Sequence, residues 1–268
     1  MSDCSTQKYS ADSHIAEIYD QVETQLDDVD LIVRLIGPST GLTIFEPFCG
    51  TGRMLIPLAR QGHRLTGLDE SAAMLARLGA KLQAEPETVR NRVQLIHSSV
   101  FAAQWPAQVD VVLLGGNCCY EVSSSDEQKA LIHRAAACLR RGGHVFIDND
   151  DHPSVELAPG WRKPPGQPRR AFPSGTCQDG TRLEGSTETA WYDIHGRFTH
   201  YIRRLKVTHT DGSISHREWQ ETCHPIVLAE VLAAVKQAGL VVEQTFGDKQ
   251  GNPYGPGSPR ALVWACKS

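Results

Sequence analysis

One stretch near the start of the chain restricts the fold more than any other. Residues 44–55 read IFEPFCGTGRML, an apolar run that passes through an acid into a glycine-flanked turn. Gly50 and Gly52 can adopt backbone angles that are closed to other residues, and they let a ligand approach the main chain. The apolar residues that follow predict a helix, whose first N–H groups are unpaired. The stretch therefore predicts a strand, a turn and a helix, with a small polar ligand bound at residues 46–53.

A second acid lies where a ribose-binding carboxylate is expected. The dinucleotide fingerprint also begins with a glycine pair after a strand, but it requires a third glycine, and Leu55 occupies that position. The next apolar run, residues 64–68, ends in Asp69, about 20 residues beyond the turn. Glu46 and Asp69 suit a ligand with ribose hydroxyls and an amino acid part, whereas Glu46 would repel a pyrophosphate. The pair therefore favours such a nucleoside over NAD.

These residues resemble the class I S-adenosylmethionine-dependent methyltransferases, in which an acid precedes Gly-x-Gly and the second strand ends in Asp. The resemblance covers most of the chain and implies S-adenosyl-L-methionine as cofactor. It implies that Tyr19, on an N-terminal helix, touches the cofactor, although packing under that helix is an equal alternative. Ser99 stands where the family often places the Asp that holds the adenine amino group. The predicted cofactor-binding residues are Tyr19, Glu46, Phe48, Gly50, Gly52, Arg53, Asp69, Glu70, Ser99, Val100, Gly116 and Asn117.

The order of the apolar patterns predicts an α/β fold. Short apolar runs alternate with helical patterns, which predicts a doubly wound, Rossmann-like parallel sheet with its ligands along the carboxyl ends of the strands. An N-terminal helical pattern runs from Ser13 to Gly37, with a break at Asp27-Asp28. The resemblance implies seven mostly parallel strands with the last one antiparallel. The expected strands are 42–47, 64–68, 93–96, 109–114, 144–149, 240–246 and 261–266.

The segment after the fifth strand no longer alternates strand and helix patterns and is rich in proline. Six prolines between residues 152 and 180 forbid a regular helix. Three alternating stretches at 182–192, 197–208 and 213–223 then follow, joined by hairpin signals. We therefore expect one methyltransferase domain over 1–268. Its parts are a cofactor-binding core at 1–150, an antiparallel lid insertion at 151–224, and a closing helix with the last two strands at 225–268.

Within the class, the chain looks most like the glycine and sarcosine N-methyltransferase group. The likeness lies in Gly116-Asn117, in Gly142-Gly143 before the fifth strand, in the hairpin insertion and in the tail at 246–254. In that group an arginine just past strand five grips the acceptor carboxylate, whereas this chain has Asn149-Asp150-Asp151. Glycine is therefore not the expected acceptor. Asp150 favours a cationic or hydrogen-bond-donating acceptor, with a solvated loop acid as the alternative.

Methyl transfer from a sulfonium requires mainly that an uncharged amine be held in line with the methyl group. A general base is needed only if the acceptor arrives protonated or is a hydroxyl. Asn117 and Tyr120 stand where amino-methyltransferases of bases or amides carry Asn-Pro-Pro-Tyr, but Cys118-Cys119 replace the prolines; a core role for Tyr120 is the competing view. The candidate catalytic residues are Tyr120, Asp150, His152 and His224. The lid segment adds possible pocket residues at Tyr192, Tyr201, Arg203, Trp219 and His224.

The composition of the chain limits which substrates and cellular settings are expected. A net charge of −4 gives no general attraction to nucleic acid, and no apolar run approaches the roughly 20 residues that span a bilayer. Eight scattered cysteines without a Cys-x-x-Cys pair favour a reduced, cytoplasmic setting, and no metal site is predicted. We therefore expect transfer to a small molecule, at nitrogen. The alternatives are O- or C-methylation, a nucleic-acid or protein methyltransferase, and a non-catalytic cofactor-binding protein.

Overall fold

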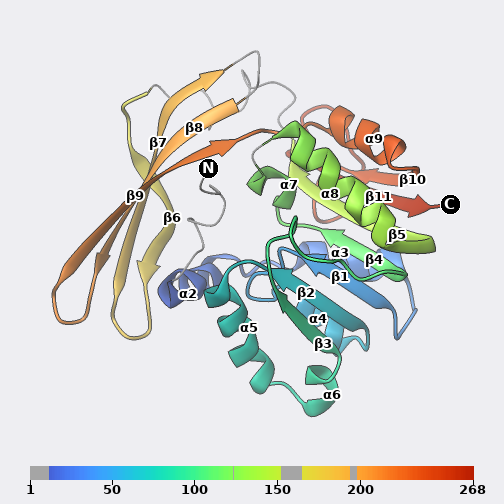
Figure 1. Cartoon of the computed structure of the whole chain (residues 1–268), viewed down its shortest axis with the longest axis horizontal. Helices are drawn as coiled ribbons and strands as arrows, with labels where there is room; N and C mark the ends of the chain where they lie inside the picture. Colours follow the sequence, from blue (N-terminus) through green and yellow to red (C-terminus); the bar gives the residue numbers. More distant parts are fainter. Residues whose placement is uncertain (1–11, 123, 152–164, 194–197) are drawn as a thin grey trace.

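The computed structural model describes residues 12–122, 124–151, 165–193 and 198–268. Its main sheet has seven strands in the order β10-β11-β5-β4-β1-β2-β3 (Figure 1). Neighbouring strands are parallel except at β11, which runs antiparallel to both β10 and β5. The predicted Rossmann-like sheet is therefore confirmed. The strand bounds are β1 Thr43–Pro47, β2 Arg64–Asp69, β3 Val93–His97, β4 Val109–Leu114, β5 Leu139–Asp150, β10 Leu240–Phe246 and β11 Arg260–Lys267.

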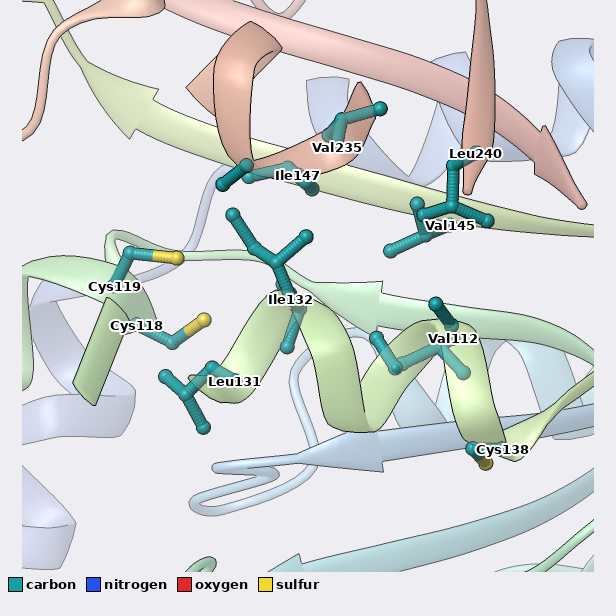
Figure 2. Close-up of a cluster of buried hydrophobic side chains, with 14 of the residues drawn as sticks. Val112, Cys118, Cys119, Leu131, Ile132, Cys138, Val145, Ile147, Val235 and Leu240 are labelled. Atoms are coloured by element: carbon teal, nitrogen blue, oxygen red, sulfur yellow. The ribbon is translucent and has the colours of Figure 1, made fainter. Parts of the chain in front are cut away.

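Successive residues of the central strands supply two cores on opposite faces of this sheet. Val112 and Leu114 of β4 pack under α8 (Ser125–Cys138) and α9 (Leu228–Gln237), in the cluster that Figure 2 shows. Val111 and Leu113 pack on the other side, against α3 (Asp27–Ile36), α4 (Leu55–Arg60) and α5 (Ala72–Gln83). Because both faces are covered, these strands are apolar almost without interruption.

The remaining helices are α2 (Ser13–Val22), α6 (Glu87–Arg90) and α7 (Cys118–Glu121). The predicted N-terminal helix is two helices, α2 and α3, with the break at residues 23–26, slightly earlier than predicted. Helix α8 ends at Cys138, and Gly142-Gly143 belong to β5. A Cβ on Gly143 would lie 3.0 Å from the carbonyl oxygens of Val109 and Asp110, so glycine at this position lets β5 run close beside β4. No helix within the described ranges is long and apolar enough to cross a membrane.

The predicted insertion forms a second, antiparallel sheet of four strands, in the order β6-β7-β8-β9. Strands β7 (Arg182–Asp193), β8 (Phe198–Thr208) and β9 (Ile214–Cys223) match the three predicted stretches. Strand β6 (Arg169–Thr176) was not predicted, because Pro173 lies inside it. The register shifts between Ala171 and Ser174, so the proline occupies an irregular place on an edge strand, where its missing N–H is tolerated.

Among the described residues, buried side chains of the second sheet meet the core in two clusters. Near one end, Leu183 and Leu205 pack against Ile15 and Ile18 of α2. Gly175 of β6 approaches α2 so closely that a Cβ there would lie 2.6 Å from Ile18. Near the other end, Tyr201 and Cys223 pack with Tyr120 of α7 and with Tyr192. The sheet therefore reaches from the N-terminal helix to the loop that follows β4.

Candidate active site

The turn after β1 requires backbone conformations that favour glycine. Phe48, Gly50 and Gly52 all have positive φ, at 65°, 52° and 79°. A Cβ on Gly52 would lie 2.3 Å from Cδ1 of Leu78, so a larger residue would disturb α5 as well as the turn. Helix α4 begins only at Leu55 and has six residues. The predicted ligand-binding stretch, residues 46–53, is therefore a strand end and a turn that precede a short helix.

Asp69 fastens this turn to the end of β2. Its Oδ2 accepts a hydrogen bond from the N–H of Gly50 at 2.8 Å, and its Oδ1 accepts one from the N–H of Ser71 at 2.8 Å. The glycine motif and the second acid, predicted separately from the sequence, thus meet through a direct contact. A carboxylate oxygen has more than one acceptor site, so these bonds leave Asp69 able to accept from a ligand.

Glu46 is a buried acid whose surroundings favour its neutral form. Its side chain is 2% exposed, and Oε2 has no hydrogen-bond partner. Burial raises the pKa of Glu46 to about 8; Arg53 opposes this rise, and Asp28 and Asp69 add to it. An unpaired buried acid beside the glycine turn is suited to receive a cation, because a positive charge would restore the carboxylate.

Arg53 holds α3, and Tyr19 of α2 contacts the second sheet. The Arg53 guanidinium donates to both oxygens of Asp28, at 2.7 and 2.6 Å, and to the carbonyl of Gln25 at 2.7 Å. These hydrogen bonds hold α3 and the loop before it against Arg53. Burial raises the pKa of Tyr19 to about 12, and its ring meets Phe172 of β6 edge-on at 6.2 Å. Tyr19 therefore lies between the turn and the second sheet.

Asp20, the residue after Tyr19, ties α2 to the turn. Its carboxylate accepts a hydrogen bond from Thr51 Oγ1 at 2.6 Å. It also forms ion pairs with Arg77 and Lys81, each at 2.9 Å. Burial opposes ionisation of Asp20, yet these partners hold its pKa below the ordinary value. Helix α2 is therefore attached to both the glycine turn and α5.

Three predicted cofactor contacts lie past β2 and β3. The Ser98 N–H donates to the Asp69 carbonyl at 3.1 Å, which brings the loop at 98–100 beside the end of β2. The Ser99 Oγ accepts from the Phe101 N–H at 3.4 Å, and buried Val100 accepts from Trp105 Nε1 at 2.8 Å. The Glu70 carbonyl lies 3.0 Å from Nε2 of His97. These residues share one rim with Asp69.

The loop after β4 has a second left-handed pair, Gly116 and Asn117, with φ of 64° and 65°. The Asn117 Nδ2 donates to Oδ2 of Asp150 at 3.0 Å, and its Oδ1 accepts from the N–H of Asp150 at 2.7 Å. Arg260 of β11 donates to Asn117 Oδ1 at 3.0 Å, to Asp148 at 2.7 Å and to Asp150. The Asp150 carboxylate, a predicted acceptor contact, is thus engaged with Arg260 and Asn117.

The other candidate bases have different surroundings. Tyr120 packs against Tyr201 and Cys223 of the second sheet. His224 is 5% exposed, its ring lies 5.0 Å from that of Phe198, and its carbonyl accepts from Gln128 at 2.7 Å. Gln128 also donates to the Cys119 carbonyl at 3.0 Å, which links α7 to His224. His152 lies outside the described residues.

The sequence did not reveal the charged residues beneath the rim. Asp28 and Asp148 are fully buried, and Lys249 lies between them, 3.1 Å from Asp28 and 3.9 Å from Asp148. With Arg53 at one end and Arg260 at the other, this series joins the glycine turn to the Asn117 loop. Its members are far apart in the chain and form no motif, so only the fold brings them together.

Arg260→Lys is expected to lower the free energy of unfolding by about 1 kcal/mol, because lysine keeps the charge near Asp148 but cannot reproduce the three-way donation. Urea unfolding measures this loss. The substitution should also loosen the Asn117 loop, so turnover should fall. Unaltered stability and turnover would show that Arg260 does not position the loop.

Known proteins resemble this chain in sequence and in fold. Residues 44–143 match the family model described as "Methyltransferase domain". Ubiquinone biosynthesis O-methyltransferases from Aeromonas salmonicida and Albidiferax ferrireducens are 33% and 32% identical over 120 and 111 residues, or 44% and 41% of this chain. In these matches the chain spans 48% and 42% of the relatives' lengths, about half or less.

Solved structures resemble nearly the whole chain. The CcbJ methyltransferase from Streptomyces caelestis has a TM-score of 0.73 at 19% identity and covers 98% of both chains. A sugar N-methyltransferase from Streptoalloteichus sp ATCC 53650 has a TM-score of 0.69 at 18% identity, covering 96% of this chain and 93% of its own. An amino pentose methyltransferase from Micromonospora echinaspora, solved with S-adenosylmethionine bound, has a TM-score of 0.65 at 18% identity and covers 96% and 98%. At such identities the likeness concerns the fold. Residues 44–143 therefore match a methyltransferase domain in sequence, and nearly the whole chain shares the fold of solved methyltransferases.

Proposed function

We propose that this protein transfers a methyl group from S-adenosyl-L-methionine to a small-molecule acceptor, at an amine nitrogen. The arrangement of Glu46, the glycine turn and Asp69 carries the proposal. The buried, unpaired acid would face the positively charged amino acid part or the sulfonium, and Asp69 would accept from the ribose hydroxyls. The remaining predicted cofactor contacts on the rim would complete the site.

The position of the second sheet supports an enclosed acceptor. We propose that residues 151–224 act as a lid within one domain over 1–268, and that the acceptor lies between the sheet and the rim. In such a space orientation and exclusion of water provide most of the rate acceleration. Tyr120 and His224 are the stronger candidate bases, because Arg260 and Asn117 already engage Asp150. His152 stays a prediction.

Nitrogen is favoured over oxygen as the acceptor atom. The sugar N-methyltransferase resembles this chain in structure over 96% of its length, whereas the O-methyltransferases match 44% and 41% of it in sequence. The likeness to the glycine and sarcosine group stays a prediction, with glycine itself disfavoured by the absence of an arginine at residues 149–151. O-methylation is the second candidate. Free thiols at the described cysteines support a cytoplasmic setting.

The cofactor is tested by isothermal titration with S-adenosylhomocysteine and with NAD, of which only the former should bind. Asp69→Asn is expected to weaken that binding by ~1–3 kcal/mol, because an amide oxygen is a poorer acceptor for the ribose and for the Gly50 N–H. Asp126→Asn, the same change on exposed α8, is the control. Binding of NAD alone, or equal affinities for the two variants, would contradict the assignment.

A screen with radiolabelled S-adenosylmethionine then separates the acceptor classes. Amines, phenols and amino acids are offered in parallel. Methylation of amines supports the proposal, and methylation of phenols alone would support the second candidate. Cofactor binding without transfer to any of these classes would favour a non-catalytic protein.

A further inference from the structure

The buried face of the second sheet carries two rows of polar residues. Residues directly opposite one another on neighbouring strands point to the same face. Thr189 pairs with Tyr201, which pairs with Glu221; two residues along, Thr187 pairs with Arg203, which pairs with Trp219. We call these six residues the polar rows; they are Thr187, Thr189, Tyr201, Arg203, Trp219 and Glu221.

The polar rows lie between the two contacts that the sheet makes with the core. On one side Tyr201, itself a row member, meets Tyr120 of α7, next to the Asn117 loop. On the other side Leu205 and Trp219 meet α2, the helix that carries Tyr19. The rows therefore span the gap between the predicted acceptor loop and the predicted cofactor helix, where an acceptor must lie for in-line transfer.

Several polar atoms of this face have no partner. Thr189 is 0% exposed, Thr187 4% and Trp219 8%, and neither the two hydroxyl oxygens nor the indole Nε1 has a hydrogen-bond partner. Most buried polar atoms in folded proteins are paired, so several unpaired atoms on one face need an explanation. A ligand that hydrogen-bonds there would supply the missing partners.

The charges on this face largely compensate one another. Arg203 donates to both oxygens of Glu221, at 2.9 and 3.2 Å. Arg203 and Arg169 also approach the Tyr201 ring, with their guanidinium carbons 4.8 and 5.8 Å from its centroid. What the rows offer a ligand is therefore mainly neutral hydrogen bonding, from hydroxyls that donate and accept and from an indole that donates.

Asn149 adds the same chemistry on the core side. It lies near the carboxyl end of β5, is 1% exposed, and neither its Nδ2 nor its Oδ1 has a hydrogen-bond partner. The neighbouring carbonyl of Asp148 accepts from the N–H of Asn117 at 3.1 Å, so Asn149 is close in the fold to the acceptor loop. In the sequence it lies in the region where the glycine and sarcosine N-methyltransferase group carries a carboxylate-gripping arginine, and it offers a neutral amide instead.

We propose that the polar rows and Asn149 form an acceptor subsite for a saturated ring that carries an amine and several hydroxyl groups, the class to which amino sugars belong. This inference rests on the proposed methyl transfer. Hydroxyl groups both donate and accept, so they match the mixture of unpaired donors and acceptors. A bare hydrocarbon amine would leave those atoms unpaired, and sites built for hydrogen bonding strongly reject such analogues.

Two six-membered rings provide the probes: D-glucosamine and cyclohexylamine, which lacks the hydroxyls. Each is titrated into protein saturated with S-adenosylhomocysteine. Glucosamine is expected to bind at least about tenfold more tightly than cyclohexylamine, from one or two additional hydrogen bonds. Equal or stronger binding of cyclohexylamine, or no binding of either ring, would overturn the proposal. Failure of S-adenosylhomocysteine to bind would instead be a failure of the proposed function.

Thr189→Val removes one hydroxyl at nearly constant volume. Because that hydroxyl is unpaired in the empty protein, the variant should have a higher Tm, and its affinity for glucosamine should fall about tenfold. Affinity for S-adenosylhomocysteine should not change. Thr208→Val, at the end of β8 and on the other face of the sheet, is the matched control and should leave glucosamine binding intact. A Thr189→Val variant that loses S-adenosylhomocysteine affinity, or keeps full glucosamine affinity, would place the rows outside the acceptor site.

Discussion

Glu46→Gln is expected to make the unliganded protein more stable at pH 8 and to remove the largest part of its loss of stability between pH 5 and 8. The pKa of Glu46 is about 8 in the folded chain, against 4.5 for the ordinary side chain. Since the folded pKa is the higher one, its contribution to stability is fully present below pH 4.5 and is lost as pH rises to about 8. The loss amounts to about 5 kcal/mol at most. Glutamine does not titrate, so urea unfolding at pH 5, 6.5 and 8 should show a much smaller loss of stability with rising pH in the variant than in the wild type.

The same substitution tests where the cofactor lies. A cation placed beside Glu46 favours the carboxylate, so binding of S-adenosylmethionine below pH 8 should release a proton and tighten as pH rises. Titrations at pH 7 in two buffers with different ionisation enthalpies measure that proton. The variant should release none and should bind more weakly by ~1–3 kcal/mol. Glu87→Gln, at an exposed position on α6, is the control. Equal proton release by the variant and the wild type would place the cation away from Glu46.

Arg53→Met is expected to lower the free energy of unfolding by ~3–5 kcal/mol, because it leaves Asp28, a fully buried carboxylate, without its bidentate partner. Because Lys249 still pairs with Asp28 at 3.1 Å in the variant, the expected loss lies toward the lower end of that range. Urea unfolding measures the loss. Arg60→Met is a matched control, because the side chain of Arg60 is 58% exposed and its pair with Glu85 should contribute less than about 1 kcal/mol.

Cofactor affinity separates two roles for Arg53. If its work is to hold α3, the folded fraction of Arg53→Met should bind S-adenosylhomocysteine as the wild type does. A large loss of affinity at conditions where the variant is folded would make Arg53 a direct contact, as the sequence predicted. Equal stability losses for Arg53→Met and Arg60→Met would contradict the buried-pair argument.

The features that the sequence predicted well are those encoded locally. The central strands were recognisable because Val111, Val112 and Leu113 face alternate cores, which makes the run apolar throughout. The glycine turn and the acid at the end of β2 were recognisable because backbone geometry and a strand end demand particular residues. The hydrogen bond from the Gly50 N–H to Asp69 joins these two features in the fold.

What the sequence could not provide are contacts made across the fold. Arg260 is 110 residues from Asp150, and nothing in the spacing links them, yet that ion pair decides how available Asp150 is. Strand β6 was missed for the opposite reason: a local signal, Pro173, argued against a strand that edge placement and a register shift allow. The register of the strands in the second sheet also decides which residues of neighbouring strands share a face. The alternation of apolar and polar residues along each strand does not give that register.

Helix α2 has one further consequence. One part of it is packed into the second sheet through Ile15 and Ile18, while Asp20 accepts a hydrogen bond from Thr51 of the glycine turn. If the second sheet acts as the proposed lid and swings outward to admit an acceptor, it would pull this helix against the turn. Under that proposal, entry of the acceptor and binding of the methyl donor at the turn would be mechanically linked.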